Sequence, residues 1–349
     1  MQKKKLNIVI LAGGESTERE VSLNSARAVT ESLARSGHRV RVVDTLTGRY
    51  LTDHSGVFLP LEGFLGADSS GKTTMTPQVI MPESVRELIR LDDGGVDVVF
   101  NALHGGLGEN GGIQALLDIM RLPYTGSPMA ASAIAMNKDI AKRVMRSLGI
   151  PTAGWRRYDA SATSFDEVVA DLARREISLP FIVKPTDGGS TVGLTLVENE
   201  AQIAGAVRAA FDVSDSLIVE KYLAGREITI AVLDGRALPP VEIKPTHKLY
   251  DYACKYTKGK SRYFCPADVD GAIAARLSDD AVRFYNTIGC RGYARVDFIV
   301  ASADNYICLE LNTLPGMTSL SLFPMAARAA GVEFDELLER LCYLALEGR

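Results

Sequence analysis

The first hundred residues set the strongest constraint on the fold. A short apolar run at residues 7–11 ends at Gly13-Gly14, and an amphipathic segment then continues to about Ser36. Further apolar runs follow at residues 40–43 and 96–100. Short apolar strands joined through a helix are typical of a parallel sheet whose crossover helix covers one face. The order therefore predicts a Rossmann-like N-terminal domain.

Composition is that of a soluble globular protein. The chain is 46% hydrophobic and 23% charged. Its 349 residues are enough for two or three domains. A net charge of −4 gives no general basic surface, and no apolar stretch approaches the ~18 residues that cross a bilayer. We therefore expect neither a nucleic-acid nor a membrane partner. The five cysteines are widely spaced and form no C-x-x-C pair, which fits a reducing cytoplasm.

Turn signals divide the chain into three predicted domains. Residues 1–125 form the N-terminal domain, in which the segment from 46 to 95 has no predictable structure. A central α+β domain, 126–222, opens with one helix expected from Met129 to Leu148. A C-terminal α+β domain, 223–349, contains a hairpin turn at Asp234-Gly235 and a long polar segment, 246–264, that suits a lid.

Residues 66–73 (GADSSGKT) match the P-loop pattern and offer Lys72 as a phosphate ligand. A working P-loop needs a buried strand before it and a helix after it, so that helix N-terminal amides face the phosphate. Pro77 and Pro82 follow within ten residues and oppose such a helix. The context therefore disfavours this segment as a nucleotide site.

Residues 184–193 (KPTDGGSTVG) form a better phosphate cradle. Lys184 ends an apolar strand, and the glycines and hydroxyls after it can fold backbone amides over anionic oxygens. Taken alone, the segment is equally compatible with a glycine-rich hairpin that carries a solvated lysine.

Two predicted strands near the C-terminus carry alternating polar residues. Arg295 and Asp297 share one face of the first, and Glu310 and Asn312 share one face of the second. An antiparallel pairing with its turn near residue 303 places 297 opposite 310 and 295 opposite 312. Oxygen ligands beside an arginine suit a hard cation that holds polyphosphate. A solvated sheet face with cross-strand ion pairs is the alternative.

Two loops could also carry chemistry. Residues 104–112 (HGGLGENGG) follow the strand at 96–100, where open α/β sheets bind ligands. Residues 314–319 (LPGMTS) directly follow the proposed metal ligands and could form an oxyanion or carboxylate site. Structural turns remain an alternative for both.

Taken in order, these segments resemble the D-alanine:D-alanine ligase family of the ATP-grasp superfamily. The resemblance covers nearly the whole chain and rests on residues 13–23, 104–109, 136–138, 184–193, 250–256, 295–297 and 310–321. Asn110, Asn137 and Asp187-Gly188 depart from the family pattern. The resemblance implies an ATP-grasp fold of mixed α/β and α+β class, in which a Rossmann-like N-terminal domain is followed by two α+β domains that sandwich ATP.

The resemblance also implies ATP-dependent joining of two D-alanines for peptidoglycan precursors, two Mg²⁺ or Mn²⁺ ions and a homodimer. It implies ATP binding by Lys138, Lys184, Glu220, Lys221, Leu223 and Glu227, and metal binding by Asp297, Glu310 and Asn312. It implies catalytic roles for Glu18, Ser190, Tyr256, Arg295 and Gly316, and substrate binding by His104, Lys255, Ser321 and Leu322. The alternatives are a D-alanine:D-lactate ligase and, in a different class, a P-loop NTPase that uses Lys72.

The contrast between the two glycine-rich segments gives a first prediction. We expect Lys184→Ala to abolish turnover and Lys72→Ala to leave it nearly intact, because only Lys184 follows a buried strand. Phosphate release in the presence of ATP and D-alanine measures both variants. An equal loss in the two variants would reverse the choice of phosphate cradle.

Overall fold

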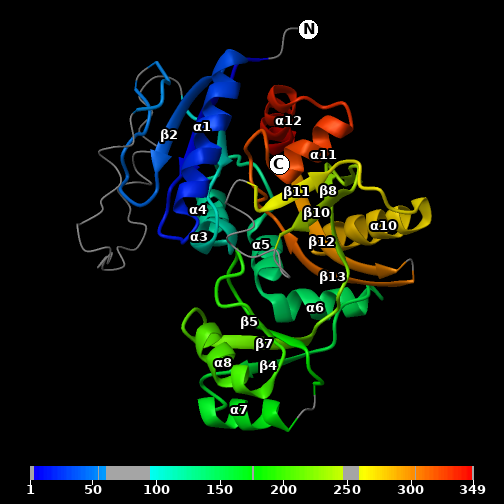
Figure 1. The fold of residues 1–349 in the computed structure, drawn as a ribbon. Helices are drawn as coiled ribbons and strands as arrows, with labels where there is room; N and C mark the ends of the chain where they lie inside the picture. Colours follow the sequence, from blue (N-terminus) through cyan, green and yellow to red (C-terminus); the bar gives the residue numbers. More distant parts are fainter. Residues whose placement is uncertain are drawn as a thin grey trace. The chain divides into compact units, whose positions relative to one another are not determined.

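The computed structural model describes residues 4–53, 55–59, 95–174, 177–246, 259–302 and 304–347 (Figure 1). The chain divides into two compact units. Unit 1 comprises Met1–Gly126, Leu314–Pro324 and Gly331–Arg349, and unit 2 comprises Ser127–Thr313 and Met325–Ala330. The division into three domains at residues 125 and 222 stays a prediction.

Unit 1 is built on a parallel sheet with the strand order β2-β1-β3. Its strands are β1 (Asn7–Ala12), β2 (Arg39–Asp44) and β3 (Val98–Asn101). Helix α1 (Arg19–Arg35) connects β1 to β2, and both β2 and β3 run parallel to β1. The expected opening of strand, helix and parallel strand is confirmed.

The other helices of unit 1 come from two distant parts of the sequence. Helices α3 (Gly106–Glu109) and α4 (Gly112–Ile119) follow β3, while α12 (Phe334–Glu347) packs on α1. The Ser32 hydroxyl donates a hydrogen bond to Asp335, and the ring of His38 contacts Glu339 at 3.0 Å. These contacts attach α12 to α1 and to the turn that precedes β2. Helix α11 (Leu322–Ala329) begins in unit 1 and ends in unit 2.

Unit 2 contains two sheets, and the first is antiparallel with the order β4-β7-β5-β6. Its strands are β4 (Trp155–Asp159), β5 (Phe181–Pro185), β6 (Thr195–Val197) and β7 (Ser216–Lys221). Helices α7 (Phe165–Ala173) and α8 (Ile203–Phe211) lie together against this sheet (Figure 1). A 3₁₀ turn at Glu200–Gln202 precedes α8, whose residues 203, 206, 207 and 210 form the buried stripe of an amphipathic helix.

The second sheet of unit 2 has the order β11-β10-β8-β12-β13. Its strands are β8 (Arg226–Leu233), β9 (Arg236–Ala237), β10 (Val241–Pro245), β11 (Ser261–Phe264), β12 (Tyr293–Ser302) and β13 (Asn305–Asn312). Its core also contains helices α5 (Met129–Met136), α6 (Lys138–Ser147) and α10 (Gly271–Thr287). The predicted hairpin joins β8 to β9 through Asp234 and Gly235, both at positive φ.

The single helix expected from Met129 to Leu148 is wrong. Asn137 has an extended backbone with ψ 101°, and its side chain accepts a hydrogen bond from the backbone N–H of Ile140 at 3.1 Å. Asn137 is therefore the N-cap of α6, and α5 ends one residue before it. The apolar residues continue across this break, so their periodicity did not reveal it.

The predicted lid, 246–264, lies mostly outside the described residues. Its last four residues form β11, which pairs antiparallel with β10. Across the described ranges, no helix is long and apolar enough to span a membrane.

Candidate active site

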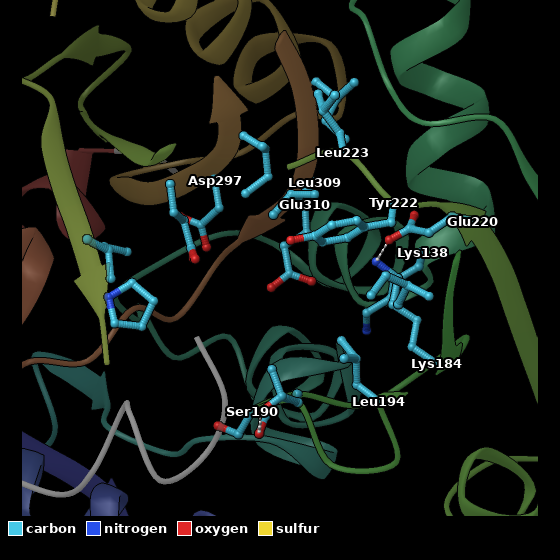
Figure 2. A pocket seen from close by; sticks show the side chains of 18 of the residues that line it. Lys138, Lys184, Ser190, Leu194, Glu220, Tyr222, Leu223, Asp297, Leu309 and Glu310 are labelled. Atoms are coloured by element: carbon cyan, nitrogen blue, oxygen red, sulfur yellow. Dashed lines mark hydrogen bonds and ion pairs between the residues drawn. The ribbon is translucent and has the colours of Figure 1, made fainter. Parts of the chain in front are cut away.

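Unit 2 contains a pocket of about 540 Å³ whose walls come from both of its sheets (Figure 2). Strands β5 and β7 and the loop 187–194 form one side, and β8, β10, β12 and β13 form the other. The predicted site residues that line it are Lys138, Lys184, Ser190, Glu220, Lys221, Leu223, Glu227, Arg295, Asp297 and Glu310. Residues far apart in the sequence thus meet at one cavity.

A buried ion triad forms the wall of the pocket at β5 and β7. Lys184 on β5 lies 2.5 Å from one carboxylate oxygen of Glu220 on β7, and Lys142 on α6 lies 2.8 Å from the other. Burial alone would raise the pKa of Glu220, but the two ammonium groups outweigh it and lower the pKa to about 2. Glu220 is therefore ionised at neutral pH, and Lys184 is held in place.

Lys184 is only 5% exposed, so the alternative of a hairpin with a solvated lysine is wrong. The loop after it takes a left-handed backbone at Gly188, Ser190, Thr191 and Gly193. A side chain at Gly193 would place its Cβ 2.9 Å from the carbonyl of Ala209, which requires glycine there.

The N-terminal end of α6 holds this loop. The Lys138 ammonium donates a hydrogen bond of 2.6 Å to the carbonyl of Gly188, and the backbone N–H of Lys138 donates to Thr186. Figure 2 shows Lys138, Lys184 and Ser190 around the same cavity. A flexible glycine-rich loop and two lysines therefore border one space, as a phosphate site requires.

The opposite wall carries the acidic residues. Strands β12 and β13 pair with Arg295 opposite Asn312 and Asp297 opposite Glu310, so the predicted register is confirmed. The side chains of Asp297 and Glu310 point into the cavity in Figure 2, and Asp297 is buried. The face is the wall of a pocket, which removes the alternative of a solvated sheet surface.

Asp297 is held by two neighbours. Arg295 donates to both of its carboxylate oxygens at 2.9 Å, and the Thr229 hydroxyl on β8 donates to one of them at 2.5 Å. Two carboxylates and the amide of Asn312 are hard oxygen donors of the kind that Mg²⁺ and Mn²⁺ prefer. In the part of the chain that is described, no group of three or more His, Cys, Asp and Glu side chains is arranged for a metal.

Asn312 lies in unit 2 but is not among the residues that line the pocket, and the other predicted residues that are described belong to unit 1. Glu18 is buried, and a Cβ on Gly105 would lie 3.0 Å from its carboxylate, so Glu18 lies against the backbone next to His104. Gly316, Ser321 and Leu322 are in the C-terminal part of the same unit. Lys255, Tyr256 and Lys72 lie outside the described residues.

A serine joins the two segments of unit 1. The Ser25 hydroxyl on α1 lies 3.2 Å from Nε2 of His104 and accepts a hydrogen bond from the backbone N–H of Met317. Ser321 accepts from the N–H of Thr318 and lies close to Gly316. The two loops singled out in the sequence, 104–112 and 314–319, are thus linked through Ser25.

Sequence reasoning missed Lys142, Thr229 and Ser25. Lys142 stands one helical turn after Lys138, and Thr229 stands two residues after Glu227 on the same strand. These spacings place each of them on the same side of its element as a predicted site residue. Their roles depend on partners elsewhere in the chain, which spacing does not reveal.

Comparisons with known proteins agree along the whole chain. Residues 7–127 match the family model described as D-ala D-ala ligase N-terminus, and residues 144–343 match the model for the D-ala D-ala ligase C-terminus. The chain therefore belongs to the D-alanine–D-alanine ligase family. Lys138 and Lys142 lie between the two matched ranges.

Individual members of the ligase family are similar over nearly their full length. The D-alanine–D-alanine ligase of Syntrophotalea carbinolica is 38% identical over 98% of this chain and 96% of its own. The solved ligase of Coxiella burnetii is 29% identical with a TM-score of 0.78, over 99% of this chain and 95% of that one. The Bacillus anthracis ligase complexed with ATP is 25% identical with a TM-score of 0.73, over 98% of both chains. The predicted ATP-grasp fold of α/β and α+β class is confirmed.

The ion triad gives a pH-dependent prediction. Because the pKa of Glu220 is lower in the folded protein, its stabilising contribution is complete above about pH 4.5 and is lost as the pH falls toward 2. Glu220→Gln should lower the free energy of unfolding by about 3 kcal/mol at pH 7 and lose less stability on acidification.

Urea unfolding at several pH values, followed by the fluorescence of Trp155, measures this effect. Trp155 is the one tryptophan of the sequence, and its ring lies 5.5 Å from the Lys142 ammonium. Asp212→Asn, at an exposed position on the same unit, is the control and should retain the wild-type pH profile. Identical pH profiles for the wild type and Glu220→Gln would contradict the assignment.

Proposed function

We propose that this protein joins two D-alanines to D-alanyl-D-alanine at the expense of ATP. The observation that carries the proposal is the unit 2 pocket, which places Lys138 and Lys184 opposite Asp297 and Glu310. Family membership supports the same activity. Neither the ester-forming ligase nor the NTPase that uses Lys72 is favoured by these findings.

The reaction has two steps. A carboxylate is a poor electrophile, so the γ-phosphoryl group of ATP first moves to a carboxylate oxygen of the first D-alanine and ADP leaves. The amine of the second D-alanine then attacks the acyl carbon, the C–O bond to phosphate breaks, and the amine loses a proton. Water must be excluded between the steps, which suits a lid at 246–264.

Different residues of the pocket would bind the phosphates and the adenosine of ATP. Lys138 and Lys184 would hold its phosphates, since both border the glycine-rich loop. The adenosine end would lie near the connection after β7, among Glu220, Lys221, Leu223 and Glu227.

Asp297, Glu310 and Asn312 would hold two Mg²⁺ or Mn²⁺ ions, because their oxygens share one face of the β12 and β13 pair. A bound divalent cation would neutralise charge on the phosphoryl group. Arg295 donates hydrogen bonds to Asp297. By the family resemblance, Arg295 and the backbone N–H of Gly316 would stabilise the oxyanion of the tetrahedral intermediate.

The substrate-binding residues follow from the family resemblance. Glu18 would recognise the ammonium of the first D-alanine, linked by hydrogen bonds to Ser190 and Tyr256. The second D-alanine would be held through its carboxylate by Ser321 and Leu322, and His104 and Lys255 would contribute to substrate binding. We further propose that the protein acts as a homodimer in the cytoplasm and supplies a peptidoglycan precursor.

The metal proposal predicts a strict cation requirement. Wild-type turnover should need Mg²⁺ or Mn²⁺ and stop in excess chelator, while Glu310→Gln should be inactive even at saturating ATP, since an amide is a weaker ligand than a carboxylate. Phosphate release measures both, and re-addition of Mg²⁺ to the chelated wild type is the control. Full activity of Glu310→Gln would remove this residue from the metal site.

The product itself tests the proposed function. Offered equimolar D-alanine and D-lactate with ATP near neutral pH, the enzyme should form mainly the dipeptide, because an amine is the stronger nucleophile and the Tyr250, Lys255 and Tyr256 positions match the dipeptide-forming members. Tyr256→Phe should relax this preference. Chromatographic separation of the products measures both, and a majority of ester from the unmodified enzyme would show the proposal to be wrong.

A further inference from the structure

A buried lysine of unit 2 belongs to the ion triad but has so far been given no role in ligand binding. Lys142 lies on α6, its side chain is fully buried, and it is not among the residues that line the pocket. Its ammonium contacts one oxygen of Glu220 at 2.8 Å, while Lys184 contacts the other at 2.5 Å. Each oxygen of one carboxylate is therefore held by a different lysine, one at the pocket wall and one behind it.

Burial lowers the pKa of Lys142, while the Glu220 carboxylate and the acceptors around the ammonium favour its charged form. The Thr152 hydroxyl donates its proton to the carbonyl of Cys308 at 3.0 Å, so its oxygen can only accept from Lys142 at 2.8 Å. The carbonyl of Ala153 accepts as well, at 3.4 Å. Together with the ion pair to Glu220 at 2.8 Å, these place three oxygen atoms around an ammonium that has three N–H groups. A neutral amine would direct its lone pair at an acceptor.

The triad therefore carries one carboxylate between two ammonium groups, which leaves one unit of net positive charge. Lys184 and Glu220 by themselves would form a neutral pair. In a buried site with little solvent screening, such a pair would present only a weak field to an anion in the pocket.

We propose that Lys142 is a positioning residue for nucleotide binding. By occupying one oxygen of Glu220, it leaves the Lys184 ammonium with the charge that holds the phosphates of the nucleotide. This inference rests on the proposed function, since the anion is the polyphosphate of ATP. It assigns to Lys142 an effect on the phosphates that acts through Lys184, without contact with the ligand.

The test compares the affinities for ATP and for adenosine, measured by calorimetry without metal and at fixed ionic strength. Lys142→Met makes the remaining pair neutral and should weaken ATP binding about tenfold more than adenosine binding. The double variant Lys142→Met with Glu220→Gln returns the net charge to one positive unit. Its ratio of ATP to adenosine affinity should return close to the wild-type value. Should the single variant fail to fold, the ratio of the double variant still decides.

Thr152→Val is the matched control. It removes a hydrogen bond to Lys142 with little change of shape and leaves the charge, so it should lower stability and keep the wild-type affinity ratio. The proposal would be overturned if Lys142→Met weakened the binding of ATP and of adenosine by the same factor. It would also be overturned if the double variant did not regain the wild-type affinity ratio, or if Thr152→Val lowered that ratio as much as Lys142→Met does. A wild-type protein that binds no ATP would instead refute the proposed function.

Discussion

The buried contact of Glu220 with two lysines is the interaction on which the pocket depends. A carboxylate removed from water costs several kcal/mol unless cations and hydrogen bonds surround it, so α6, β5 and β7 must hold their side chains in one fixed arrangement. The arrangement extends further, because Thr152 binds both Lys142 and the Cys308 carbonyl of β13. The triad is thereby connected to both sheets of unit 2.

The opposite wall of the pocket carries buried negative charge, which is compensated by its own hydrogen-bond donors. Asp297 receives hydrogen bonds from Arg295 and Thr229, so its buried charge is compensated within the protein. Glu310 lies opposite it in the sheet register. The pocket thus has Lys138 and Lys184 on one side and Asp297 and Glu310 on the other, a distribution that suits a polyphosphate accompanied by divalent cations.

The fold could be predicted where the sequence has a clear pattern of apolar residues. The parallel sheet of unit 1 follows from the order of apolar strand, helix and apolar strand. The register of β12 with β13 follows from strand alternation, since a shift of the turn leaves the polar residues on the same face. Strand β4 (WRRYD) escaped prediction because it is mostly polar and only partly buried. The break at Asn137 escaped because a cap bond, which periodicity cannot show, decides it.

The spacing of residues in the sequence identified which residue types belong to the site. It did not reveal how many charges the folded site brings together. The glycine-rich loop and the acidic strands are local patterns, and the structure brings them to one pocket. Lys142 and Ser25 gain their importance from Glu220, His104 and Met317, which are distant in sequence and adjacent only after folding. The number of charges that share a buried site is set by packing, so a lysine that does not line the pocket can determine how strongly the pocket attracts an anion.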